Sequence, residues 1–353
     1  MRKGSERRGV ALRIGVLLAL AAAAIAVVAT SATAKPSAGN YVLGVSNTHI
    51  NNGWREEMIC SIKAEALVSG KVSKVVLANR ETDPAGQIAD IRNLISAGAN
   101  AIIINPASPS ALNGVIAQAA AKGVKIVSVD QRVTAPQAYN ATNDQEGYGY
   151  LGASWLFKTL KGKGNVVEMR GIPGVPADTD RHNGFTRALK AYPGIKVVKS
   201  IYTQWAFPTA AKQMLDILNS GVKVDGVWTS GADYTVVNAF KTAGKPLVPV
   251  VGADTNEFLK QQLTVKGFHG AAVTNPATIG GVGASMAIKL LDGGTVPKWV
   301  KLKPAVWDNK KAADLKLIKA NYSPTRPPTY SARLTIAPWT HYKPAQLFSC
   351  KGP

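Results

Sequence analysis

Two continuous apolar runs with a helical segment between them form the clearest pattern in this chain. The runs cover residues 101–104 and 124–129, are rich in β-branched side chains and show no polar alternation. Such runs are typical of strands that are covered on both faces, as in a parallel sheet. Residues 109–122 between them have a helical pattern, and strand, crossover helix and strand make a βαβ unit. The pattern therefore predicts an α/β fold.

Three polar residues, Asp130, Gln131 and Arg132, come directly after the second run. In open α/β sheets, ligands bind outside the carboxyl ends of the strands. Asp130 is accordingly the first candidate site residue.

The same alternation extends along most of the chain. The expected strands cover residues 41–46, 74–78, 101–104, 124–129, 165–170, 196–202, 226–229, 249–252 and 270–274. The expected helices cover residues 54–69, 84–96, 109–122, 145–160, 179–191, 208–218, 234–243 and 275–291. A second series of elements begins near Asn143, and two alternating series predict two similar α/β domains.

Residues 308–353 lack this alternation and hold six prolines. We interpret them as an irregular, Pro-rich C-terminal extension that wraps the surface, with a flexible tail as the alternative. The presence of Tyr322, Tyr330, Trp339 and Cys350 favours an extension that packs on the protein.

Residues 1–34 have the layout of a secretory signal peptide. Five basic residues precede an apolar run over residues 14–28, and Ala32-Thr33-Ala34 provides a cleavage site before Lys35. An uncleaved membrane anchor is the alternative, because the apolar run extended to Ala34 reaches spanning length. No Cys follows the run directly, which argues against a lipid-anchored form. We expect export to the periplasm or to the outer face of the cytoplasmic membrane.

The 353-residue chain has a formal net charge of +21. Removal of the signal peptide takes away five basic residues and one acidic residue and leaves +17. Such an excess can attract nucleic acid or anionic envelope polymers. The Lys and Arg residues are spread along the chain, without an Arg-rich run or a nucleic-acid motif. We interpret them as a solvated basic surface and expect no nucleic-acid partner.

The chain has two cysteines, Cys60 and Cys350. Disulfides persist in exported proteins, so these two residues are candidates for a bridge that holds the C-terminal extension. The bridge requires that their Cα atoms come within about 7 Å of each other. A catalytic thiol is disfavoured, because no partner motif surrounds either residue.

Six segments together carry a resemblance to a known family. They are residues 45–54 (VSNTHINNGW), 103–108 (IINPAS), 127–132 (VSVDQR), 171–185 (GIPGVPADTDRHNGF), 241–245 (KTAGK) and 250–254 (VVGAD). In this order, and behind an export signal, they resemble the type I periplasmic sugar-binding proteins of the ribose-binding type. The resemblance covers about residues 41–307.

That resemblance implies two Rossmann-like, three-layer lobes joined by a three-segment hinge, with the ligand enclosed when the lobes close. It implies an N-terminal lobe of residues 41–142 plus 275–307 and a C-terminal lobe of residues 143–274. The chain would cross between the lobes near residues 142–143, 254–255 and 274–275. Closure of this type is hinge bending that ligand contacts stabilise.

A sugar has apolar C–H faces and a rim of hydroxyl groups, which suit flat aromatic rings and the polar groups of Asp, Asn and Arg. The resemblance implies that Trp54 and Trp205 stack on the sugar, with core packing as the alternative. It implies hydroxyl contacts for Asn52, Asp130 and Asp254, although Asn52 is also a candidate N-cap for the helix that follows.

Thr274 and Asn275 lie where the family has a glutamine contact, and Asn275 is alternatively the N-cap before Pro276.

The chain departs from the ribose-type pattern at two places. Gln131 stands where that pattern has an arginine, and Arg132 comes one position later. Thr179 replaces a second arginine, while Arg181 matches an arginine farther from the ligand. Because an arginine provides a rigid fork of donors that Gln and Thr cannot copy, we expect a ligand other than ribose.

An enzyme is the main alternative class. The GGVGA sequence at residues 280–284 resembles a dinucleotide fingerprint only superficially, because it falls inside a predicted helix. The chain lacks the P-loop, H-E-x-x-H, C-x-x-C and G-x-S-x-G motifs. His49, His182, His269 and His341 share no metal-ligand spacing. We expect no catalytic residue, no metal site and no cofactor, although a hydrolase that uses Asp130 and Asp254 stays open.

Two further alternatives share the fold. A sugar-responsive repressor would need a DNA-binding helix-turn-helix where this chain has an export signal. A ligand sensor for a chemoreceptor or sensor kinase stays open. The favoured hypothesis is a monomeric, exported solute-binding protein that captures a small polyhydroxylated ligand, a monosaccharide above all. Its partner would be the permease of an ABC importer.

Overall fold

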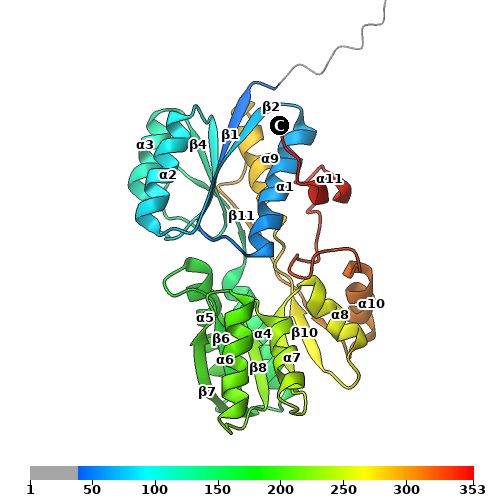
Figure 1. The fold of residues 1–353 in the computed structure, drawn as a ribbon. Helices are drawn as coiled ribbons and strands as arrows, with labels where there is room; N and C mark the ends of the chain where they lie inside the picture. Colours follow the sequence, from blue (N-terminus) through cyan, green and yellow to red (C-terminus); the bar gives the residue numbers. More distant parts are fainter. Residues whose placement is uncertain (1–38) are drawn as a thin grey trace, which may run out of the picture. The chain divides into compact units, whose positions relative to one another are not determined.

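The computed structural model describes residues 39–353, which fold as one compact unit (Figure 1). The predicted signal peptide, residues 1–34, lies outside the described residues. No helix within residues 39–353 is both long enough and apolar enough to cross a membrane.

The first lobe is built on a six-stranded parallel sheet with the strand order β11-β5-β4-β3-β1-β2. Its strands are β1 (Tyr41–Asn47), β2 (Val72–Asn79), β3 (Ala101–Asn105), β4 (Lys125–Asp130), β5 (Tyr139–Asn143) and β11 (Trp299–Leu302). Helices α1 (Gly53–Ser69) and α9 (Ile279–Leu291) cover one face of the sheet, and α2 (Pro84–Ser96) and α3 (Asn113–Ala121) cover the other. Both faces are therefore apolar, as the continuous runs predict.

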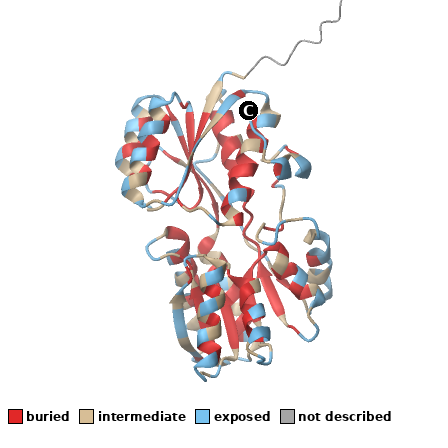
Figure 2. Ribbon diagram, viewed as in Figure 1, coloured by how far each residue is buried: buried red, intermediate tan, exposed pale blue. Residues whose placement is uncertain are grey.

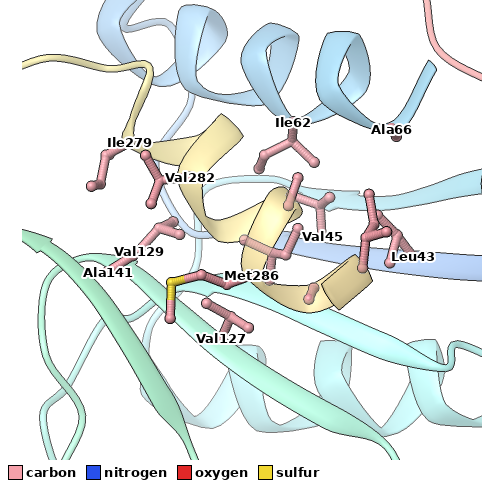
Figure 3. Packing of buried hydrophobic residues seen from close by; sticks show 14 of the residues in the cluster. Leu43, Val45, Ile62, Ala66, Val127, Val129, Ala141, Ile279, Val282 and Met286 are labelled. Carbon is pink, nitrogen blue, oxygen red and sulfur yellow. The ribbon is translucent and has the colours of Figure 1, made fainter. Parts of the chain in front are cut away.

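Figure 3 shows the packing between this sheet and its first helix layer. Ile62 of α1 and Met286 of α9 lie in the same buried cluster as Val45 and Val127 of the sheet. Helix α9 lies so close to α1 that a Cβ on Gly280 would overlap the backbone carbonyl of Met58. Close helix packing thus explains the glycines that resemble a dinucleotide fingerprint.

The second lobe repeats the arrangement around the strand order β12-β10-β9-β8-β6-β7. Its strands are β6 (Lys163–Arg170), β7 (Gly194–Tyr202), β8 (Gly226–Thr229), β9 (Val250–Ala253), β10 (Gly270–Val273) and β12 (Val306–Asp308). Helices α4 (Gln145–Thr159) and α5 (Pro176–Leu189) cover one face, and α6 (Phe207–Asn219), α7 (Asp233–Thr242) and α8 (Asn256–Thr264) cover the other. Buried residues concentrate in the strands of both sheets and on the helix faces toward them (Figure 2). The predicted pair of α/β lobes is confirmed.

The chain passes between the two sheets after β5, after β10 and between β11 and β12. The expected crossing at residues 254–255 is wrong, because β9 and β10 are neighbours in the same sheet. The expected end of the first lobe at residue 307 is also wrong. Residues 306–308 form β12, which pairs antiparallel with β10 and places Trp307 in the core of the second lobe. This strand is too short to leave a recognisable pattern in the sequence.

The C-terminal extension, residues 308–353, is more regular than we expected. It contains α10 (Ala312–Asn321) and α11 (Pro344–Ser349). Helix α10 packs on α8 through its one buried residue, Ile318, and α11 packs on α1 through Leu347. One buried position in each helix is too few to produce a periodic pattern, which is why the sequence reads as irregular.

In the structure, a disulfide joins Cys60 of α1 to Cys350 at the end of α11, with 4.5 Å between the Cα atoms. The backbone carbonyl of Pro353 accepts a hydrogen bond of 3.3 Å from Val75 on the edge strand β2. The C-terminal end of the chain is therefore held on the first lobe.

Candidate functional site

A cavity lies at the carboxyl ends of the strands, with walls from both lobes. From the first lobe and from the crossings come His49, Asn52, Trp54, Arg55, Asp130 and Asn275. From the second lobe come Ala177, Arg181, Trp205, Phe207, Ser230, Gly231, Ala253 and Thr255. Thr329 comes from the C-terminal extension.

Two indole rings form part of the cavity wall. The Nε1 atom of Trp54 donates to the backbone carbonyl of Asn275 at 2.7 Å, and that of Trp205 donates to the carbonyl of Ser230 at 2.8 Å. The only polar atom of each ring thus bonds to the protein, and its apolar faces remain for packing against a ligand. Trp205 has a left-handed backbone with φ of 50°, as does Gln204 with φ of 59°.

Asp130 lies directly after the buried run of β4, where the chain turns out of the sheet. Its φ of 67° is rare for a residue other than glycine, although Asp tolerates it better than most. Its Oδ1 atom accepts hydrogen bonds from Nδ2 of Asn143 at 3.1 Å and from Nε2 of Gln145 at 2.7 Å. Burial raises the pKa of this carboxyl, while the charges of Arg55 and Arg181 act in the opposite direction. A strained, buried carboxylate on a cavity wall is typical of a functional site.

Two buried arginines lie on the same wall. Arg181 donates from Nε to Gln145 at 2.7 Å and from Nη1 to the carbonyl of Ser230 at 2.7 Å, and its guanidinium lies 4.2 Å from the ring centroid of Tyr148. Arg55 donates from Nη1 to Oδ1 of Asn47 at 3.0 Å. Burial lowers the pKa of Arg55 to about 10, so this side chain stays charged at neutral pH. Its other N–H groups have no hydrogen-bond partner among residues 39–353, which leaves donors for a ligand.

Two asparagines complete the polar part of the wall. Asn52 caps α1, since its Oδ1 atom accepts from the backbone N–H of Arg55 at 3.3 Å. Its Nδ2 atom also donates to the carbonyl of Trp205 in the other lobe at 3.2 Å. The Oδ1 atom of Asn275 is buried and has no hydrogen-bond partner within the described residues. A buried acceptor of this kind costs free energy unless a ligand or water bonds to it.

The cavity brings together six of the predicted site residues, namely Asn52, Trp54, Asp130, Arg181, Trp205 and Asn275. The structure places the other five outside the cavity wall.

Two of those five form hydrogen bonds to residues of the cavity wall. Gln131 donates to Oδ1 of Asn105 at 2.6 Å and accepts from the backbone N–H of Ala177 at 2.8 Å, so it links the two lobes. Asp254 is fully buried, and its Oδ1 atom accepts from the backbone N–H of Asn275 at 2.9 Å. It therefore holds the segment that carries Asn275, instead of facing the cavity.

The remaining three are Arg132, Thr179 and Thr274. Arg132 is exposed, with its guanidinium 4.9 Å from the ring centroid of Trp299. Thr179 is exposed on α5. The hydroxyl of Thr274 accepts from the backbone N–H of Ala305 at 2.9 Å, which fastens two crossing segments to each other.

The sequence prediction missed several wall residues. Arg55 follows Trp54 directly, so its place in the first turn of α1 was a usable signal. Phe207 and Ser230 follow the carboxyl ends of β7 and β8, where side chains reach the site. Thr329 left no signal, because only the path of the C-terminal extension brings it to the cavity. His49, whose Nδ1 atom lies 2.9 Å from Oε1 of Glu81, is also part of the wall.

Within residues 39–353, no three His, Cys, Asp or Glu side chains gather in an arrangement that could hold a metal ion.

Comparison with known proteins gives a consistent result. The model of a family described as "Periplasmic binding protein domain" matches residues 43–295. The xylitol-binding protein of Mycolicibacterium smegmatis is 28% identical over 63% of this chain and 65% of its own length, which is less than two thirds. The ribose import binding protein of Bacillus subtilis is 25% identical over 76% of this chain and 88% of its own length.

Solved structures agree with the fold. An ABC transporter solute binding protein from Thermobispora bispora has a TM-score of 0.72 and 28% identity, over 84% of this chain and all of its own. A solute binding protein from Mycobacterium smegmatis with bound glycerol has a TM-score of 0.72 at 23% identity, over 84% of this chain and 100% of its own, and shows the fold alone.

Proposed function

We propose, because this chain belongs to the periplasmic binding protein family, that it is an exported solute-binding protein for a small polyhydroxylated ligand. The ligand is a monosaccharide or a related polyol, and the protein delivers it to the permease of an ABC importer. The family match covers most of the chain and both lobes.

The observation that carries the proposal is the composition of the cavity wall. Two indole rings with satisfied N–H groups lie on the same wall as an aspartate, two arginines and an asparagine with a free acceptor. Apolar ring faces match the C–H faces of a sugar, while carboxylate, guanidinium and amide groups match its hydroxyls. This set of side chains binds and orients a ligand. It contains no nucleophile with an adjacent base, so binding without turnover is the better-supported chemistry.

Lobe closure is the mechanism that the three crossings support. Trp54 and Asp130 belong to the first lobe, whereas Trp205 and Arg181 belong to the second. A ligand that bonds to both sets gains its full free energy of binding only when the lobes are together. It therefore shifts the population toward the closed state.

The names of relatives support the same ligand class. The curated relatives include proteins named for the binding of xylitol and for the import of ribose. The departures at Gln131 and Thr179 from the ribose pattern favour a ligand other than ribose.

A thermal-shift screen of the mature chain, residues 35–353, tests the proposal. The panel is D-ribose, xylitol, D-galactose and glycerol, with amino acids as the negative set. A ligand at 100 times its Kd adds about 2.7 kcal/mol to the free energy of unfolding, which raises Tm by several degrees. If no member of the sugar and polyol set stabilises the protein, the proposal is wrong.

A further inference from the structure

The C-terminal extension crosses from the second lobe to the first close to the cavity. We call residues 323–333 the crossing segment. Before it, α10 packs on α8 of the second lobe, and after it, α11 packs on α1 of the first lobe (Figure 1). The family match ends at residue 295, so the whole segment lies beyond it.

On the second lobe, the crossing segment caps helix α8. The backbone N–H groups of Asn256 and Glu257 donate to the carbonyls of Tyr330 at 2.9 Å and Pro328 at 3.0 Å. Helix N-termini leave such N–H groups without partners inside the helix, and here the segment provides them. The side chain of Asn256 also donates to the carbonyl of Ser323 at 2.8 Å.

On the first lobe, the segment is held through Ser331. The backbone N–H of Ser331 donates to Oε2 of Glu57 at 2.6 Å, and its hydroxyl donates to the same oxygen at 3.0 Å. The hydroxyl oxygen in turn accepts from the backbone N–H of Ala277 at 3.0 Å. Glu57 and Ser331 are both buried, so water does not compete for these bonds.

Thr329 lies between these attachment points and is part of the cavity wall. It is half-buried, and its hydroxyl has no hydrogen-bond partner among the described residues. It packs so closely on the start of α1 that a Cβ on Gly53 would overlap the hydroxyl. Because residues 328, 330 and 331 are all hydrogen-bonded, the backbone on both sides of Thr329 is held in place.

We infer that Thr329 is a specificity-determining residue of the ligand site, and that the C-terminal extension supplies it as a wall that neither lobe provides. The inference rests on the proposed function. The hydroxyl of Thr329 both donates and accepts, so it matches a hydroxyl group of the ligand. A ligand without a hydroxyl at that place leaves the threonine unpaired and binds less tightly.

Two substitutions and a matched control test the inference by isothermal titration calorimetry. Thr329→Val keeps the shape and removes the hydroxyl, Thr329→Ser keeps the hydroxyl, and Thr325→Val makes the same change at an exposed position of the crossing segment. The titrants are the tightest binder among D-ribose, xylitol and D-galactose, and each of its monodeoxy analogues. Circular dichroism melts check that every variant folds.

We expect Thr329→Val to raise Kd about three- to tenfold, with Thr329→Ser and Thr325→Val close to the unaltered protein. The loss should vanish for one monodeoxy analogue only, which identifies the hydroxyl that Thr329 contacts. The inference is overturned if the unaltered protein binds a sugar and Thr329→Val has the same Kd as the unaltered protein for that sugar and for each analogue. In that case the proposed function stands. If the unaltered protein binds none of the panel, the proposed function fails and the inference fails with it.

Discussion

Asp130→Asn is the sharpest test of the candidate site, because it changes the charge of one wall residue and little else. Asparagine has nearly the same size and also tolerates a left-handed backbone, so the φ of 67° does not become more costly. Its side-chain oxygen can still accept from Asn143 and Gln145. What is lost is the second, charged acceptor at the cavity.

The expected loss of affinity follows from the type of bond. A hydrogen bond to a charged group contributes about 1.5–3 kcal/mol, so Kd should rise about 10- to 150-fold. The stability of the unliganded protein should behave differently. Burial raises the pKa of Asp130 above its ordinary value, so the free energy of unfolding falls as the pH rises from the ordinary pKa to the folded pKa, and it stays lower above that pH. A neutral amide removes this cost, and the variant should be at least as stable as the unaltered protein at pH 7.

Calorimetry with a ligand that stabilises the unaltered protein measures the first effect, and urea melts measure the second. Asp144→Asn is the matched control. Asp144 caps α4 and pairs with Lys301 at 2.9 Å close to a crossing, but it is not part of the cavity wall. An unchanged Kd in Asp130→Asn would refute the assignment of this carboxylate to the ligand. Equal losses in both variants would mean that affinity depends on the charge of the region instead of on a contact.

Three other predictions concern residues outside the cavity wall. Burial raises the pKa of Glu57 to about 8, so the free energy of unfolding should fall as the pH rises from about 4.5 to 8. In Glu57→Gln, urea melts should show a free energy of unfolding that depends less steeply on pH. An unchanged pH dependence would contradict this. Replacing Cys60 and Cys350 by serine removes a disulfide with a sequence separation of 290 residues. This should lower the free energy of unfolding by about 2–5 kcal/mol in urea melts. An unaltered midpoint would mean that the disulfide does not restrict the unfolded chain. Gln131→Ala removes the hydrogen bond to Ala177 in the other lobe. It should raise Kd about three- to tenfold and raise the radius of gyration of the unliganded protein in X-ray scattering. No change in either quantity would exclude a role of Gln131 in lobe closure.

Much of the fold could be predicted because its signals are local. A strand buried on both faces requires a continuous apolar run wherever it occurs, and the run before Asp130 is such a case. The place where a run ends also marks the edge of a sheet, which is why Asp130 could be selected before its surroundings were known.

Where the prediction failed, the outcome depended on distant partners. Asp254 follows its strand much as Asp130 ends its own, yet its carboxylate accepts from the backbone N–H of Asn275 and is fully buried outside the cavity wall. Gln131 differs from the family pattern, and the structure explains the difference by a bond to the other lobe.

The sequence by itself determined the alternation of strands and helices over most of the chain, the two lobes and a set of polar and aromatic residues at strand ends, because periodicity and turn chemistry act over a few residues. Only the tertiary structure decided which of those side chains share a cavity, that β12 joins the second sheet and that Thr329 reaches the site from the C-terminal extension. These outcomes depend on hydrogen bonds and packing between residues that are far apart in the sequence. A local pattern of apolar and polar residues does not indicate which distant residues come into contact.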